Sequence, residues 1–152
     1  MVVSDTTPIT TLLKADQADL LRNIFGSVTI PGAVFEELRA FHAEVPSFVL
    51  VQILVDPDQR LPGTENLGRG EAEAIRLAKE TEADILLIDD RKARTAAASL
   101  GVKCTGVLGL VVHAKLTDNI TSLRAMIELL ETQGGLYLSA EVKAEALRIA
   151  GE

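Results

Sequence analysis

Short apolar runs alternate with amphipathic segments along most of the chain. The run at residues 85–88 is continuously apolar, as is typical of parallel strands buried on both faces. Other runs of β-branched and apolar residues predict further strands at residues 2–4, 28–30, 48–55 and 102–104. Strands that alternate with helices favour an α/β fold of three layers, α/β/α, around a central, mostly parallel sheet.

Helices are predicted between these strands from apolar residues at helical spacing and from residues that begin or end helices. Proline suits a first helical turn, so helices are expected to begin near Pro8 and at Pro31. The other predicted helices cover residues 15–24, 71–82, 91–100, 106–115, 120–132 and 139–150. Residues 136–138 form a predicted edge strand. Residues 56–70 contain prolines and glycines without periodicity, which predicts a loop.

Length and composition fit one globular domain over residues 1–152, with 47% hydrophobic and 24% charged residues. No internal repeat or domain boundary is visible. Cys104 is the only cysteine, so no internal disulfide can form. We find neither a charged-then-apolar leader nor an apolar run near the roughly 18 residues of a membrane span. These features predict a cytoplasmic protein without membrane contact.

The net charge of −7 argues against a broad basic surface that would attract nucleic acid over long distances. The aromatic content points the same way, with one tyrosine, no tryptophan and four phenylalanines. It argues against the base-stacking platforms of proteins that bind single strands.

Two aspartates directly follow predicted strands. Asp5 comes after residues 2–4, and Asp89 comes after residues 85–88. Either one alone would be interpreted as a solvated loop residue or a helix cap. Ligands of open α/β sheets bind outside the carboxyl ends of the strands, so we expect both aspartates on that rim. Like charges brought close together need a cation or a proton, which makes the pair informative.

Two glutamates lie beside the predicted buried faces of helices. At 100° per residue, a buried stripe is predicted for Val34, Leu38, Phe41 and Val45. Glu37 lies on the flank of this stripe, whereas Glu36 faces water.

In the helix of residues 71–82, Glu71 lies about 40° from Ile75, and Glu73 lies about 160° away, on the opposite side. Leu77 also falls on the Glu73 side, so the inward face of this helix is less clearly defined. A lone glutamate beside an apolar face usually extends to water or pairs with a basic side chain. Together with the two aspartates, Glu37 and Glu71 favour a cluster of four carboxylates.

Oxygen ligands without histidine or cysteine fit Mg²⁺ or Mn²⁺ and not zinc. The two histidines, His42 and His113, lie far apart within predicted helices, and we interpret them as structural or surface residues.

Four segments resemble the acidic motifs of PIN domains, in the same order along the chain. Residues 3–9 (Val-Ser-Asp-Thr-Thr-Pro-Ile) resemble the family's opening, and residues 30–38, with Glu-Glu near their end, resemble its second motif. Residues 67–75, with Gly-Glu-Ala-Glu, and residues 86–91, with Asp-Asp, resemble the third and fourth. The similarity is greatest to a prokaryotic PIN subfamily related to the toxin nucleases of toxin–antitoxin pairs.

The resemblance implies a ribonuclease that cleaves single-stranded RNA with Mg²⁺ or Mn²⁺. It implies catalytic carboxylates at Asp5, Glu37, Glu71 and Asp89, and metal ligands at Asp5, Glu71, Asp89 and Asp90. Thr6 follows the first aspartate as the pattern requires and is assigned to substrate binding. The toxin branch usually has aspartate where Glu71 stands, which has a longer side chain. We prefer Asp89 to Asp90 because its separation of 18 residues from Glu71 matches the family's spacing.

Several basic residues beside the acidic motifs are candidates for holding flanking phosphates: Arg69, Arg91, Lys92 and Arg94. Their alternative interpretation is an ordinary solvated helix face. The main alternative to an enzyme is a non-catalytic module that binds nucleic acid or protein through a vestigial acidic site. A phosphatase of the haloacid dehalogenase type would need Asp-x-Asp-x-Thr, whereas Asp5 is followed by Thr-Thr-Pro. The resemblance also favours a homodimer, and it leaves open whether an antitoxin protein is a partner.

Overall fold

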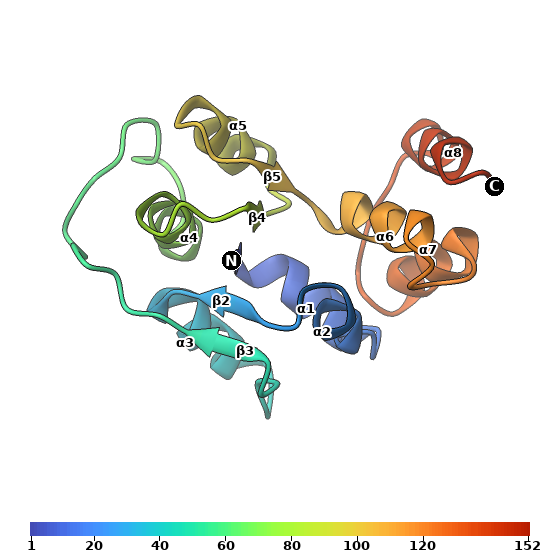
Figure 1. The fold of residues 1–152 in the computed structure, drawn as a ribbon, viewed down its shortest axis with the longest axis horizontal. Helices are drawn as coiled ribbons and strands as arrows, with labels where there is room; N and C mark the ends of the chain where they lie inside the picture. Colours follow the sequence, from blue (N-terminus) through green and yellow to red (C-terminus); the bar gives the residue numbers. More distant parts are fainter.

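The computed structural model describes residues 1–152 and contains five strands. Their bounds are Val2–Ser4 for β1, Val28–Ile30 for β2, Val49–Val51 for β3, Ile85–Leu87 for β4 and Cys104–Thr105 for β5. They form one sheet in the order β3-β2-β1-β4-β5, in which every neighbouring pair is parallel (Figure 1). The prediction of a central parallel sheet is confirmed.

Eight helices accompany the sheet. Their bounds are Thr6–Lys14 for α1, Asp19–Phe25 for α2, Gly32–Phe41 for α3, Arg69–Glu80 for α4, Arg91–Ser99 for α5, Val107–Leu116 for α6, Leu123–Thr132 for α7 and Ala140–Ile149 for α8. In Figure 1, α4 and α5 lie on one side of the sheet, and α1, α2 and α6 lie on the other. This arrangement is the predicted three-layer α/β/α fold. None of these helices has both the length and the apolar character that a membrane crossing requires.

The strand order reverses at β1. The chain passes outward from β1 through β2 to β3, and then continues on the other side of β1 as β4 and β5. The central strands β1 and β4 are therefore neighbours, and their pairing ends with Ser4 opposite Leu87. Such a reversal point leaves a crevice at the carboxyl ends of the strands in open α/β sheets. The residues that follow β1 and β4 are therefore placed at this crevice.

The core encloses both central strands. Val3 of β1 and Leu86 and Leu87 of β4 are fully buried, as is Ile88 just after β4. A strand that is covered on both faces needs apolar side chains on both, because its side chains alternate between them. The continuous apolar run at residues 85–88 reflects this burial.

Two predicted elements are shorter than expected. The helix predicted at residues 15–24 begins only at Asp19, because Asp16 adopts the left-handed conformation with φ of 56° and separates α1 from α2. The strand predicted at residues 48–55 pairs with β2 only over Val49–Val51. The amide of Gln52 makes the last hydrogen bond to β2, after which the chain leaves the sheet.

Two further predictions, a buried stripe and an edge strand, differ from the structure, the first only in part. Val34 and Leu38 of α3 are fully buried as predicted, but Phe41 is 76% exposed and Val45 lies beyond the helix. The predicted stripe assumed a helix that continues to Val45, whereas α3 ends at Phe41. Residues 136–138 form no strand, because the chain there is not part of the sheet.

Candidate active site

The four predicted carboxylates lie at the crevice between β1 and β4. Asp5 follows β1 directly and is only 4% exposed. Its backbone amide donates a hydrogen bond to the Leu87 carbonyl at 2.9 Å. Asp89 follows β4 by two residues and is partly buried. Glu37 of α3 and Glu71 of α4 are partly buried as well. Neighbouring strands and the helices beside them thus supply all four.

Thr6 links the site to α3. Its hydroxyl donates a hydrogen bond to the Glu37 carboxylate at 2.5 Å, between Oγ1 and Oε2. This contact holds the first residue of α1 against the second acidic motif. Thr6 therefore positions a carboxylate of the site in this structure.

Two glycines make room for the carboxylates. A Cβ atom built on Gly70 would lie 2.5 Å from Glu37 Oε1, and one built on Gly106 would collide with Asp89 Oδ1. Neither glycine has a positive φ, so the backbone conformation alone would accept other residues. Glycine is required at these positions because the carboxylates pass so close to the backbone.

Burial and mutual repulsion act on the carboxylates. Burial, together with the charges of Glu71, Glu37 and Asp89, raises the pKa of Asp5 to about 7, against the opposing effect of the hydrogen bond from the Thr6 amide. Burial likewise raises the pKa of Glu71, to which the charges of Asp90 and Glu37 contribute. These carboxylates are therefore close enough to influence one another's protonation.

Asp89 and Asp90 have different surroundings. Asp89 Oδ1 accepts a hydrogen bond from the Val107 amide at 2.8 Å, whereas its Oδ2 is buried without a partner. Burial raises the pKa of Asp89, and the Val107 amide and the charge of Arg94 act against it. Asp90 is exposed and caps α5 by accepting a hydrogen bond from the Ala93 amide at 3.0 Å.

The Glu71 side chain also caps the start of its own helix, α4. Its Oε1 accepts a hydrogen bond from the Gly68 amide at 3.1 Å, in the first turn of α4. An amide at the start of a helix has no partner within the helix, so this contact stabilises the helix end. One oxygen of the Glu71 carboxylate is therefore engaged in capping.

The donor chemistry of this site fits Mg²⁺ or Mn²⁺, although the side chains do not form a finished ligand set. Carboxylate oxygens are the donors that these cations prefer, and the buried Oδ2 of Asp89 lacks any other partner. A cation would also offset the repulsion that raises the pKa of Asp5. No three aspartate, glutamate, histidine or cysteine side chains are grouped closely enough to hold a metal ion. Binding would therefore require the carboxylates to move together.

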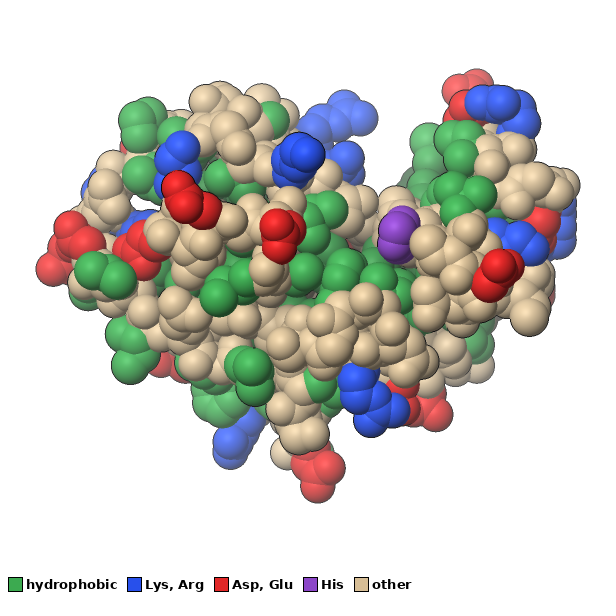
Figure 2. Space-filling model, in the orientation of Figure 1, with side chains coloured by type: hydrophobic (Ala, Val, Ile, Leu, Met, Phe, Trp, Pro, Cys, Tyr) green, Lys and Arg blue, Asp and Glu red, His purple; other side chains and the backbone are tan.

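Two of the predicted phosphate-binding residues, Arg91 and Arg94, share a cavity with a carboxylate of the site. Both line a cavity that also includes Asp89, and both are exposed on α5. Figure 2 shows this face hollowed between α5 and α8, with basic side chains bordering the α5 side. Lys92 is exposed on the same helix but does not line the cavity.

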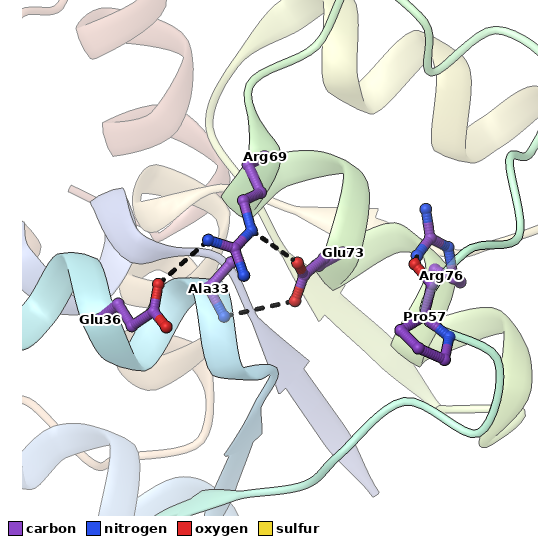
Figure 3. A network of polar contacts seen from close by, with 6 residues as sticks. All are labelled: Ala33, Glu36, Pro57, Arg69, Glu73 and Arg76. Atoms are coloured by element: carbon purple, nitrogen blue, oxygen red, sulfur yellow. Dashed lines mark hydrogen bonds and ion pairs between the residues drawn. The ribbon is translucent and has the colours of Figure 1, made fainter.

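Arg69 is engaged elsewhere. Its guanidinium pairs with Glu36 Oε2 at 3.1 Å and with Glu73 Oε2 at 3.0 Å (Figure 3). These ion pairs join α3 to α4 and direct Arg69 toward other carboxylates. A phosphate at Arg69 would have to compete with both glutamates.

Glu73 was predicted to lie on the outward side of α4, and that interpretation is wrong. Its side chain is only 18% exposed, and its Oε1 accepts a hydrogen bond from the Ala33 amide at 3.3 Å (Figure 3). The prediction failed because α4 packs against α3 as well as the sheet. Leu77, which falls on the same side as Glu73 and is fully buried, was the available signal.

Comparison with known proteins agrees with the fold that places these residues. The family model of DUF3368, a PIN domain, matches residues 1–152. Among solved structures, the chain is similar to a PilT N-terminus domain protein from the hyperthermophilic archaeon Sulfolobus solfataricus, with 21% identity and a TM-score of 0.59. That match covers 75% of this chain and 93% of the archaeal one, and at this identity it supports the fold alone. No curated protein matches the chain. Because the family model spans the chain from end to end, the protein belongs to the PIN-domain family.

Proposed function

We propose that this protein is a metal-dependent endoribonuclease that cleaves single-stranded RNA. PIN domains are typically nucleases that use divalent metal ions. The observation that carries the proposal is the buried Asp5, whose pKa is raised to about 7 beside three further carboxylates at the reversal point of the sheet. Such an arrangement needs a proton or a cation to offset its repulsion and is typical of functional sites.

Asp5, Glu71, Asp89 and Asp90 are the proposed metal ligands. The charge of Asp90 acts on Glu71, and its carboxylate also caps α5. A bound Mg²⁺ or Mn²⁺ would acidify a water molecule and neutralise charge on phosphate oxygens. Glu37 is held by Thr6 and is the proposed residue that orients the attacking water. Asp5 exchanges its proton near neutral pH, which suits it to binding a cation under those conditions.

The proposed substrate is a single strand because a flexible backbone can enter a recessed site more easily than a duplex can. Arg91 and Arg94 stand beside Asp89 and are the proposed phosphate contacts. Only a few phosphates are neutralised in this way, and the net charge is −7. Binding is therefore expected to be weak and only modestly dependent on salt, with little action on duplex DNA.

A non-catalytic binding module is the second candidate function. Two observations favour it, namely the capping contact of Glu71 and the lack of a finished ligand set. On this interpretation the acidic residues are vestigial, and the basic face of α5 binds nucleic acid without cutting it. A toxin role, an antitoxin partner and a homodimer extend the first proposal and rest on the motif resemblance alone.

Cleavage of an unstructured RNA with Mn²⁺ tests the proposal. The parent protein should cut the RNA slowly, and Glu37→Gln should abolish cutting. Glu36→Gln is the matched control, because Glu36 is the adjacent carboxylate, is mostly exposed and contacts only Arg69. We expect it to cut nearly as fast as the parent.

The double variant Asp5→Asn with Asp89→Asn should also lose cleavage while retaining binding. Cutting that persists in this variant would reveal a contaminating nuclease. Binding without cutting by the parent would favour the non-catalytic module instead.

A further inference from the structure

A cavity of about 580 Å³ extends from Asp89 to the segment between α7 and α8. Its volume is within the range of roughly 300–1,000 Å³ that ligand sites occupy. Arg91 and Arg94 line it on the α5 side, and Tyr137 lines it from the segment before α8. Asp89 is the only acidic side chain in the lining. The cavity therefore connects the candidate active site with two arginine side chains and the ring of Tyr137.

Tyr137 is held facing outward by its neighbours. Leu136 and Leu138 are partly buried and pack against the core, while Tyr137 between them is 88% exposed. Alternate side chains of an extended chain point to opposite sides, which explains this pattern. An edge strand was predicted for this segment. Its side chains alternate between buried and exposed as in a strand, although it pairs with no other strand.

The backbone just before Tyr137 is fixed by contacts with α7 and α1. The Leu136 amide donates to the Leu130 carbonyl of α7 at 3.1 Å. Gly134 packs so closely on α1 that a Cβ there would lie 2.8 Å from the Thr11 carbonyl oxygen. The segment is thus attached to two helices. An exposed ring on a fixed backbone loses little conformational freedom when it binds a flat partner.

We propose that Tyr137 stacks on one base of a single-stranded RNA whose phosphates contact Arg91 and Arg94. This inference rests on the proposed function, because it assigns a binding position to the same substrate. An aromatic ring accepts any base through its face, and guanidinium groups pair well with phosphate. Stacking on a single ring requires an unpaired base, but it does not discriminate among the four bases. The backbone of the bound strand then passes the carboxylate of Asp89.

A duplex does not fit this description, because its bases are stacked on one another and present only their edges. The sequence argued against a platform of several aromatic residues, and the cavity contains only one. One stacked base and two phosphate contacts correspond to a short, weakly held segment of RNA. Tyr137 therefore adds to the preference for single strands that the recessed site already favours.

The intrinsic fluorescence of the protein provides the first test, because the chain contains one tyrosine and no tryptophan. The parent protein is titrated in chelator, which prevents metal-dependent cleavage, with a six-nucleotide RNA. An abasic RNA of the same length, which retains the phosphates, is the matched ligand. After correction for the light that the bases themselves absorb, the base-bearing RNA should quench the tyrosine emission, whereas the abasic RNA should not. Equal quenching by both, or none by either, would overturn the proposal.

Binding of a labelled RNA, followed by fluorescence anisotropy, provides the second test. Tyr137→Ala should weaken binding about 5- to 100-fold, as expected for the loss of one stacked base. Tyr137→Phe should bind like the parent, because the ring face and not the hydroxyl makes the contact. Phe41→Ala is the control, since Phe41 is also an exposed aromatic residue but lies outside the cavity. Unchanged affinity in Tyr137→Ala would rule out stacking.

These results separate the two proposals. If the parent binds RNA through Tyr137 but never cleaves it, the nuclease proposal fails and the stacking site stands. If cleavage occurs, Tyr137→Ala should raise KM and leave kcat nearly unchanged, because stacking stabilises the bound substrate and the transition state alike. Cleavage with an unchanged KM would leave the nuclease proposal intact and remove the stacking site.

Discussion

At the scale of single residues, Asp5 bears most of the electrostatic strain of the site. It is nearly inaccessible to water and lies beside three carboxylates whose negative charges raise its pKa. Its position after β1 was predictable from the apolar run that precedes it. The raised pKa was not predictable, because it depends on burial and on the charges of Glu37, Glu71 and Asp89, which only the folded chain brings together.

The pKa of Asp5 makes the metal-free protein less stable as the pH rises. A folded-state pKa near 7, above the usual aspartate value of 3.8, stabilises the fold below about pH 4, and this contribution is lost as the pH rises through 7. The shift corresponds to a few kcal/mol. Asp5→Asn should remove this part of the pH dependence, so its stability relative to the parent should rise between pH 5 and pH 8. Urea denaturation in chelator measures this difference, and parallel curves for both proteins would contradict the assigned pKa.

Gly106 allows a second prediction at this scale. Gly106→Ala should push Asp89 out of position, because the new Cβ would occupy the place of Oδ1. We expect cleavage to fall at least about tenfold and the free energy of unfolding to fall by roughly 1–3 kcal/mol. Gly32→Ala is the matched control, since a Cβ at Gly32 would meet nothing within 4 Å. Equal effects on cleavage rates and denaturation midpoints would show that space at Gly106 is unimportant.

At the scale of elements, α4 shows where the helical pattern was insufficient. Glu71 lies on the inward side of α4, as its angular position on the helix predicts. Glu73 and Arg76 are also largely buried, so α4 has no single exposed side opposite a single buried one. Arg76 is only 4% exposed, and its Nη1 donates to the Pro57 carbonyl at 2.7 Å (Figure 3). Such burial arises because residues 52–68 pass over the helix, and a sequence pattern assigns a loop without saying where it lies.

Arg76→Met should loosen residues 52–68 without unfolding the protein. The variant loses the hydrogen bond to Pro57, but it also removes the buried Nε that has no partner, so the two effects on stability nearly cancel. We expect faster amide exchange in this loop and a change in the free energy of unfolding below about 1 kcal/mol. Arg60→Met, which alters an exposed arginine of the same loop, should leave exchange unchanged. Hydrogen exchange followed by mass spectrometry measures this, and equal exchange in both variants would contradict the anchoring role of Arg76.

At the scale of the whole molecule, the order of strands and helices was predictable because each central strand is a short apolar run between amphipathic segments. The reversal at β1 then places Asp5 and Asp89 just after the ends of neighbouring strands. The sequence could not predict the cavity that Tyr137 shares with Arg94, because its walls come from segments far apart in the chain. The single domain over residues 1–152 and the roles of the carboxylates remain predictions.

The central claim is that the carboxylates at the edge of the sheet share one divalent cation. Titration calorimetry of Mn²⁺ into the parent protein at pH 8 tests it most directly, because Asp5 is then free of its competing proton. We predict one binding site in the parent, retained in Glu36→Gln and lost in Asp5→Asn. Binding by Asp5→Asn as tight as that of the parent, or none by the parent, would contradict the claim.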